Sequence, residues 1–469
     1  MNGLSSLDPA AASNFENIWP VNQIFNGLVQ LDDSMVIRPC IAKSYSLSED
    51  GLEYSFYLRN DVYFHDNLCF EKGKGRKVIA KDFVYSFERL FDSKVSSAIS
   101  LLEFIDRSEK SNYKGFIAIN DTLLKIYLKK PFSSFLSILT MKFFSVIPRE
   151  AIEMYAQDFR KNPVGTGAFT FKAWDEGTKL ILLKNQNYFE RDSNQNRLPY
   201  LDALTVSFIK DRETSFMELL NGKFDMLSGA DAFNTNEVLD KQGELRELYK
   251  KKFYLQKQTF LKTDYIGILV DEKNPIVINS PLKLKAIRKA INYAFDRNKL
   301  VKYLRNNIGE AAHAGFIPKG LKSYNPNLVK GYDYNPEMVQ KLLAEAGYRD
   351  GVGLPELVMH TTDVYKEQAE FIQSQLAENN IRIQISIEKS SVLRQAVNNS
   401  EYNLFKKSWY SDYADEENFM SLFYSKNFSP QGVNFFHYNN VRFDIVYEIA
   451  LKENDELKKI IAGTKKSKY

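Results

Sequence analysis

The order of apolar patterns between residues 357 and 410 constrains the fold of this chain more than any other feature. Five consecutive segments alternate between the period of a strand and that of a helix: 357–360, 364–378, 381–387, 391–398 and 402–409. In the third segment, for example, isoleucine alternates with polar residues, whereas in the second the apolar residues lie three and four positions apart. This β-α-β-α-β order predicts a mostly parallel sheet with helices covering its faces.

An acidic residue follows the last of these predicted strands. Asp412 comes three residues before Asp415, which we predict to be the N-cap of a short helix. Glu416 and Glu417 then occupy the first turn, where negative charge suits the helix dipole. Asp412 has no comparable structural duty, and ligands of open α/β sheets bind outside the carboxyl ends of the strands. Asp412 is therefore a candidate ligand residue, and the alternative is a solvated loop acid.

Other local signals predict further elements. Residues 44–48 and 54–59 alternate across Asp50-Gly51, which predicts a β-hairpin. Residues 279–304 predict one helix beginning at Ser280 and Pro281. A second helix is predicted to begin at Asn335 and to end at Gly347.

Length and composition indicate an ordinary globular protein of more than one domain. A chain of 469 residues exceeds a single core and predicts two or three domains. The net charge of +4 gives no indication of nucleic acid binding. Cys40 and Cys69 fit no metal motif, and both a disulfide and two buried thiols remain open. No apolar run is long enough to span a membrane.

The sequence carries no recognisable catalytic motif. Its four histidines are far apart in sequence and form no HExxH pair for a metal. A GxSxG elbow and a phosphate-binding loop are also absent. The acids between 412 and 417 lack the spacing and the central glycine of a calcium loop. We therefore predict a protein that is not an enzyme and has neither a metal site nor a cofactor.

Short segments along the whole chain resemble one family. The segments are 6–9, 25–29, 42–45, 50–59, 64–66, 80–86, 163–169, 198–202, 287–297 and 412–415. In number, order and spacing they resemble the extracytoplasmic solute-binding proteins of peptide/nickel-class ABC transporters, especially the oligopeptide- and dipeptide-binding members.

The resemblance implies an α/β fold of the periplasmic-binding-protein type, type II-like, with two lobes that close by hinge motion. It also implies an additional domain inserted into lobe one. Lobe one would comprise residues 1–35 and 164–262, and the inserted domain residues 36–163. Lobe two would comprise residues 263–469 and contain the β-α-β unit with Asp412 at its rim.

The resemblance also implies a set of ligand-binding residues. Asp412 occupies the position of an aspartate that pairs with the α-ammonium group of a peptide. The backbone of Ser408, Trp409 and Tyr410 would pair with an extended ligand. Residues 12–15, which include Asn14 and Phe15, would pair with its other side. Lys406 aligns with an arginine that meets the ligand carboxylate in some members, although a lysine lacks the two-pronged geometry of arginine.

By this resemblance the protein captures short peptides and delivers them to the membrane permease of an ABC importer, without catalysis. It would be a monomer in the periplasm or another extracytoplasmic space, anchored as a lipoprotein in its full-length form. A nickel chelate, haem or sugar is the alternative ligand, and a peptide hydrolase is a rival from another class. A paralogue that no longer binds and acts structurally or as a sensor is a third hypothesis.

Two departures from the family pattern bear on this prediction. The chain begins without a signal peptide or a lipid-bearing cysteine. It also ends soon after residues 443–447, where the family continues and returns to lobe one, so that we expect a truncated or frameshifted product. An exposed apolar patch on lobe one would follow.

Overall fold

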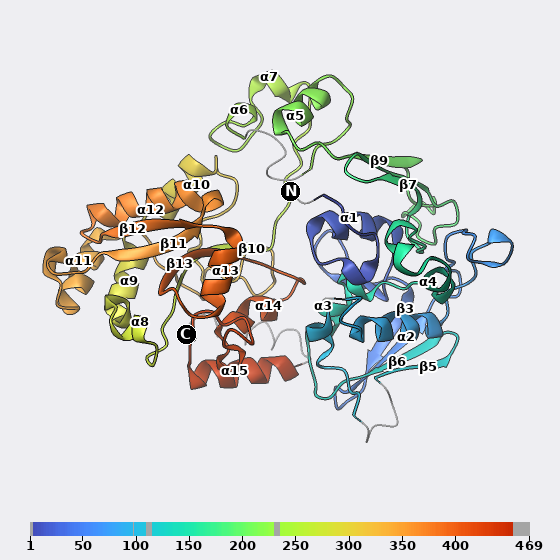
Figure 1. Ribbon diagram of the computed structural model, residues 1–469, viewed down its shortest axis with the longest axis horizontal. Coiled ribbons are helices and arrows are strands. Elements are labelled where there is room, and N and C mark those ends of the chain that lie inside the picture. The colour runs from blue at the N-terminus through green and yellow to red at the C-terminus, as the bar shows by residue number, and fades with distance from the viewer. Residues whose placement is uncertain (1–2, 97, 109–114, 229–234, 454–469) are drawn as a thin grey trace. The chain divides into compact units, whose positions relative to one another are not determined.

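The computed structural model describes residues 3–96, 98–108, 115–228 and 235–453 (Figure 1). The chain divides into two compact units, Met1–Thr214 (unit 1) and Ser215–Tyr469 (unit 2). The domain limits predicted at residues 35, 163 and 262 stay predictions. The segment 454–469, on which the prediction of a truncated end partly rests, lies outside the described residues.

The described residues of unit 1 form three antiparallel sheets. The first pairs β1 (Val29–Leu31) with β2 (Ile37–Pro39). The second has the order β3 (Ala42–Leu47), β4 (Glu53–Leu58), β6 (Leu123–Tyr127), β5 (Phe116–Asn120). The third has the order β7 (Phe169–Asp175), β8 (Lys179–Lys184), β9 (Ala203–Ser207). The pairing of β3 with β4 confirms the predicted hairpin, in which Gly51 has φ +71°.

In the described part of unit 1 the α-helices are α1 (Phe15–Ile24), α2 (Ala80–Glu88), α3 (Phe135–Leu139) and α4 (Arg149–Tyr155). Helices α1, α2 and α3 contact these sheets, and α4 contacts α2. Aromatic side chains form much of the core. Phe87 of α2 is fully buried and meets Phe83, Phe116 and Phe144 edge to face, with ring centroids 5.3–5.8 Å apart. Such contacts are favourable beyond the burial of area alone, and they account for part of the high aromatic content.

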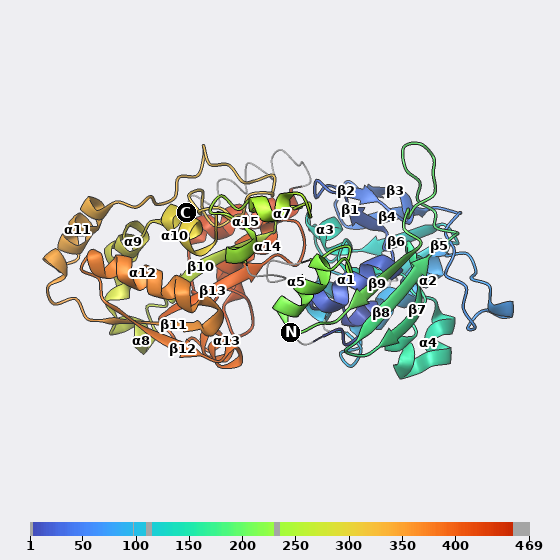
Figure 2. The same cartoon turned by 90° about the horizontal axis from the view of Figure 1, so that it is seen from above.

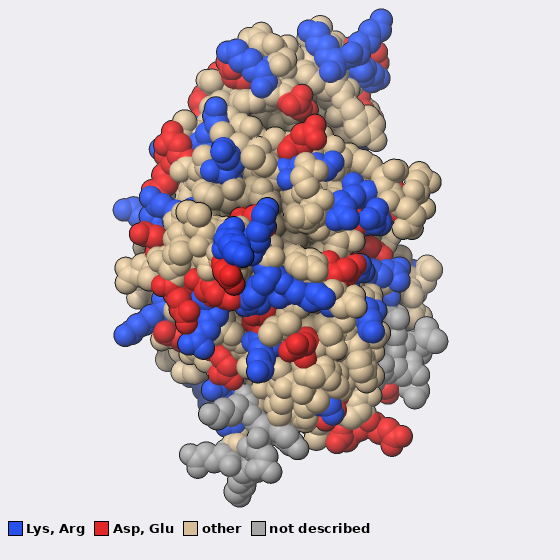
Figure 3. Space-filling model, turned by 90° about the vertical axis from the view of Figure 1, so that its right-hand side faces the viewer, with Lys and Arg blue, Asp and Glu red and all other residues tan. Residues whose placement is uncertain are grey.

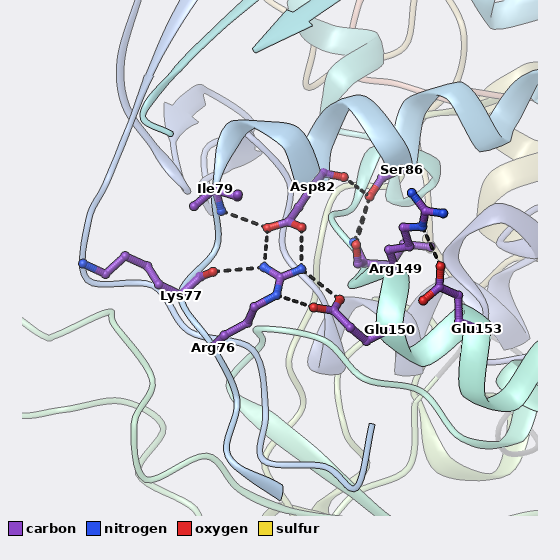
Figure 4. A network of polar contacts seen from close by, with 9 residues as sticks. Arg76, Lys77, Ile79, Asp82, Ser86, Arg149, Glu150 and Glu153 are labelled. Carbon is purple, nitrogen blue, oxygen red and sulfur yellow. Dashed lines mark hydrogen bonds and ion pairs between the residues drawn. The ribbon is translucent and has the colours of Figure 1, made fainter. Parts of the chain in front are cut away.

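Partly buried ion pairs lie at the two ends of α2. Figure 4 shows the Arg76 guanidinium donating to both oxygens of Asp82, in the first turn of α2, and to both oxygens of Glu150 in α4. Just beyond α2, Arg89 donates to both oxygens of Asp8 at 2.9 and 2.5 Å. These forks join distant segments with defined geometry. On the side of the molecule drawn in Figure 3, acidic and basic side chains are interspersed over the surface.

Unit 2 is built on one mixed sheet with the order β10 (Lys262–Ile268), β13 (Leu404–Tyr410), β11 (Leu357–Thr362), β12 (Ile383–Glu388). The pairs β13–β11 and β11–β12 are parallel, which confirms the predicted β-α-β-α-β unit. Strand β10 adds an antiparallel edge.

The α-helices α5 to α15 follow in this order: α5 (Arg212–Leu220), which crosses the division between the units, α6 (Thr235–Val238), α7 (Glu247–Lys250), α8 (Pro275–Ile278), α9 (Lys285–Tyr293), α10 (Arg297–Leu304), α11 (Pro336–Glu345), α12 (Lys366–Glu378), α13 (Ser390–Asn398), α14 (Glu416–Met420) and α15 (Val441–Lys452). Side chains of α9, α11 and α12 share a core with Leu404 on one face of the sheet. Those of α13 share another core with Phe405 on the opposite face (Figure 2). Successive residues of β13 therefore face opposite cores, as the alternation predicted.

The single helix predicted over residues 279–304 is wrong. The chain leaves the helical path after α9, and Asp296 starts α10 by accepting a hydrogen bond from the Lys299 backbone at 3.0 Å. Ser280 caps only a short 3-10 turn. A capping aspartate inside an apolar stripe therefore divides the helix.

The helix predicted from Asn335 is confirmed as α11, with Asn335 as its N-cap and Gly347 at φ +87° just after its end. None of the described helices combines the length and the apolar character needed to cross a bilayer.

Candidate ligand-binding site

The sheet of unit 2 has a topological switch point between β11 and β13. From β11 the chain passes through α12, on one face of the sheet, to β12, which neighbours β11 on one side. It then passes through α13, on the other face of the sheet, to β13, which neighbours β11 on its opposite side. The carboxyl ends of β11 and β13 therefore border the place where ligands of open α/β sheets bind. Tyr365 follows β11 there, and Asp412 follows β13.

Five polar side chains meet beside this switch point: Lys262, Asp264, Tyr365, Lys406 and Ser408, here called the switch-point cluster. The Ser408 hydroxyl donates to Asp264 at 2.5 Å and is hydrogen-bonded to the Tyr365 hydroxyl. The Lys262 ammonium lies 3.0 Å from the same Asp264 oxygen. The Lys406 ammonium lies over the Tyr365 ring, 4.4 Å from its centroid, where a cation is attracted by the π face.

The switch-point cluster contains two cations and one carboxylate. Lys406 is 3% exposed. Burial lowers its pKa to about 8, although Asp264 opposes that shift. For Asp264, burial raises the pKa, but Lys406, the Ser408 hydrogen bond and Lys262 together hold it below its usual value. An anionic group placed beside Lys406 would favour its charged form, so the cluster suits a carboxylate.

The backbone of β13 is paired differently along its two edges. Strand β10 pairs with one edge over the full length, from Leu404 to Tyr410. On the other edge, β11 pairs only at Phe405, and no described strand pairs with residues 406–409. Since backbone groups at such an edge can accept an added strand, this second edge of β13 can bind an extended peptide.

Asp412 lies two residues beyond this edge, and its side chain is exposed. Desolvation by the surrounding protein raises its pKa, and a hydrogen bond with Asn418 opposes that shift. The Asp412 side chain is nevertheless exposed to water, so its carboxylate is accessible. Within the described residues no ion pair joins Asp412 to a cation. Its carboxylate is therefore available to a ligand ammonium group.

The loop that holds Asp412 is fixed by α14. Asp415 is the N-cap of α14 and accepts a hydrogen bond from the Glu417 backbone at 2.9 Å, which confirms the prediction. Asn418 of α14 accepts from the Trp409 indole at 2.9 Å and from the Asp412 backbone at 3.4 Å. The indole of Trp409 thus has a structural partner, and any contact of Trp409 with a ligand backbone stays a prediction.

The predicted residues of unit 1 lie at the start of α1. The Asn14 side chain caps this helix by accepting from the Asn17 backbone at 2.9 Å. Phe15 is the first residue of the helix, and its side chain is 59% exposed. Their pairing with a ligand stays a prediction. Unit 1 also exposes other large apolar side chains, among them Trp19, Tyr200 and Leu201.

Three members of the switch-point cluster were missed by the sequence analysis. Lys262 and Asp264 alternate on β10, but their approach to β13 depends on an antiparallel register that pairs Asp264 with Ser408. Tyr365 carried a partial signal, since it stands at the start of the helix predicted over 364–378, which follows the strand predicted at 357–360. In the described part of the chain, no three His, Cys, Asp or Glu side chains come together as a metal site.

The mixed α/β sheet of unit 2 with its switch point is typical of the α/β periplasmic-binding-protein fold. The family model described as "Bacterial extracellular solute-binding proteins, family 5 Middle" matches residues 36–431, and the chain belongs to this family.

Individual relatives are similar over nearly the whole chain. The "Glutathione-binding protein GsiB" of Escherichia coli (strain K12) is 27% identical over 98% of this chain and 83% of its own length. The periplasmic binding protein DppA from Helicobacter pylori, solved in complex with the peptide STSA, is 27% identical with a TM-score of 0.71, covering 99% of this chain and 88% of that one.

A second solved structure, HbpA2 from Haemophilus parasuis, has a TM-score of 0.81 at 23% identity and covers 99% of this chain and 90% of that one. These matches confirm the predicted family and the periplasmic-binding-protein fold.

Proposed function

We propose that this chain captures short peptides outside the cytoplasm and delivers them to the permease of an ABC importer. The observation that carries the proposal is the arrangement along β13. Cationic Lys406 lies at one end of its second edge, and the exposed carboxylate of Asp412 lies beyond the other end. A peptide has the complementary order, with an ammonium group at one terminus and a carboxylate at the other.

In this proposal the ligand lies antiparallel to β13 as an added strand. Its backbone pairs with residues 408–410, its α-ammonium group meets Asp412, and its carboxylate meets the switch-point cluster. Asn14 and Phe15 contact its other side. Four residue steps separate Lys406 from Tyr410, about 13 Å of strand. A peptide of three or four residues has about this length.

Two comparisons support a peptide ligand. DppA from Helicobacter pylori holds the peptide STSA, and GsiB carries the name of a glutathione-binding protein. Glutathione is itself a tripeptide with one ammonium and two carboxylate groups, so it belongs in the set of ligands to be tested. The family consists of solute-binding proteins, and the peptide should leave the protein unchanged. A monomeric state and a lipid anchor on the full-length form remain part of the proposal.

Isothermal titration calorimetry tests the proposal with a tetrapeptide, its N-acetylated form, its C-terminal amide and glutathione. We expect saturable binding of the unmodified peptide and at least about tenfold weaker binding of each blocked form, because one charged contact is lost in each. If a nickel–histidine chelate, haem or a sugar binds and no peptide does, the peptide proposal is contradicted and the alternative ligand takes its place. Fragments of the peptide after incubation would indicate a hydrolase.

A further inference from the structure

A cavity lies in unit 1, and none of the seven predicted ligand residues lines it. Its volume is about 500 Å³, within the range of small-molecule sites. Its lining comes from α1 and the turn after it, from the segment that precedes β9, and from the residues that follow α3. The lining residues that matter most are Trp19, Lys142, Tyr188, Glu190, Leu201 and Leu204.

One side of this cavity is apolar and open to water. Trp19 is 38% exposed and Leu201 59% exposed, and Tyr200 beside Leu201 is 69% exposed. Large apolar side chains that gather at a concavity are typical of a surface that a ligand covers. The indole also offers a flat face to an aromatic group.

The polar side of the cavity carries the carboxylate of Glu190 and the ammonium group of Lys142. The Glu190 carboxylate is already satisfied, because Tyr188 donates to one oxygen at 2.9 Å and Gln30 donates to the other at 2.6 Å. The half-buried ammonium of Lys142, by contrast, has neither a hydrogen bond nor an ion pair with any residue that the structure describes. A cation that lacks a partner in a partly desolvated position favours an incoming anion.

The neighbouring thiol does not supply that anion. Burial raises the pKa of Cys40 to about 12, and the Glu190 carboxylate adds to this shift, so the thiol is neutral. Burial likewise lowers the pKa of Lys142, with Cys40 opposing.

We propose that this cavity binds a small organic anion, whose carboxylate pairs with Lys142 and whose aromatic or branched body lies against Trp19 and Leu201. The carboxylate supplies the charge-assisted hydrogen bond that the ammonium lacks. The apolar body covers the exposed side chains of the rim. All lining residues of this cavity belong to unit 1, and none of them is among the proposed peptide contacts.

The test uses 4-fluorophenylacetate and its uncharged analogue 4-fluorophenylacetamide, observed by fluorine NMR titration of the full chain. We expect saturable binding of the acid at least about tenfold tighter than that of the amide, because only the acid pairs with Lys142. Lys142→Met should abolish this preference, and Lys142→Arg should keep it. Lys81→Met, which removes an exposed lysine of α2, serves as the matched control and should behave as wild type.

Thermal unfolding of each variant shows whether the fold is intact. If Lys142→Met does not fold, the affinities of acid and amide are compared in Lys142→Arg, which should keep the preference for the acid. Equal affinities of acid and amide for wild type would overturn the proposal. So would a preference that survives Lys142→Met, or the absence of saturable binding by either compound. Failure of peptides to bind in unit 2 would leave these results unaffected.

Discussion

Replacement of Asp412 by asparagine tests the proposed ammonium contact with the smallest change of shape. The substitution removes the negative charge and keeps a side chain of similar size that still reaches Asn418. Asp412 is exposed and lies outside the regular elements, between β13 and α14. We therefore expect little change in the free energy of unfolding, below about 0.5 kcal/mol.

The expected loss of affinity follows from the kind of contact. A hydrogen bond to a charged group contributes about 1.5–3 kcal/mol, which corresponds to about 10- to 150-fold in Kd. The accessible carboxylate favours the lower half of this range, because water screens the pair. An N-acetylated peptide has no ammonium group, so its affinity should change by less than about twofold in the variant.

The pH dependence gives an independent check. Desolvation raises the pKa of Asp412 in the ligand-free protein. A protonated carboxyl cannot pair with the ammonium, so wild-type affinity should be constant well above this pKa and fall as the pH falls through it. In Asp412→Asn this decrease should disappear.

Calorimetric titration of wild type, Asp412→Asn and the matched control Glu356→Gln measures all three effects. Glu356 is exposed and precedes β11, at the opposite end of the strands, so its replacement should leave peptide affinity unchanged. Equal peptide affinity of wild type and Asp412→Asn would refute the ammonium contact. An equal loss for the acetylated peptide would show that the substitution acts through the shape of the loop.

Three further predictions concern stability. Burial lowers the pKa of Lys406 from 10.5 to about 8, so the unfolded state binds more protons between these values and stability should rise with pH there. In Lys406→Met the increase in unfolding free energy between pH 7.5 and 9.5, measured by urea unfolding, should be smaller than in wild type, by at most about 3 kcal/mol. Asp8→Asn leaves the partly buried Arg89 without its carboxylate and should lower the unfolding free energy by about 3 kcal/mol, measured by urea unfolding; a change below about 0.5 kcal/mol would contradict this. Phe87→Ala should lower it by about 3–5 kcal/mol by opening a cavity among the three rings that Phe87 contacts, and an unchanged thermal midpoint would show that the core of unit 1 is packed otherwise.

The sequence predicted the parts of the fold that local patterns determine. A side-chain period of two residues predicted the strand β12, and a period of about 3.6 residues predicted the helix α12. Asp415 as a cap follows from an acidic residue before an apolar run. The helix predicted over 279–304 was wrong because the prediction followed the apolar stripe and ignored Asp296. The preference of aspartate for the N-cap position would have indicated a new helix there.

The candidate site was predicted only in part, because it depends on contacts between distant segments. Ser408 and Asp264 are hydrogen-bonded across 144 positions of sequence. Neither the antiparallel pairing of β10 nor its register is written in a local pattern. Asp412 could be predicted because its position just after the carboxyl end of a predicted strand can be read from the local sequence alone.

The measurement that tests the central proposal most directly is mass spectrometry of small molecules released when the purified protein is denatured. A thermal melt with a mixture of di- to pentapeptides accompanies it, since ligand at about 100 times its Kd stabilises by about 2.7 kcal/mol. The proposal predicts more peptide released from wild type than from Asp412→Asn, and a larger rise in melting temperature for wild type than for the variant. A released chelate, haem or sugar, or the absence of any peptide-dependent stabilisation, would contradict it.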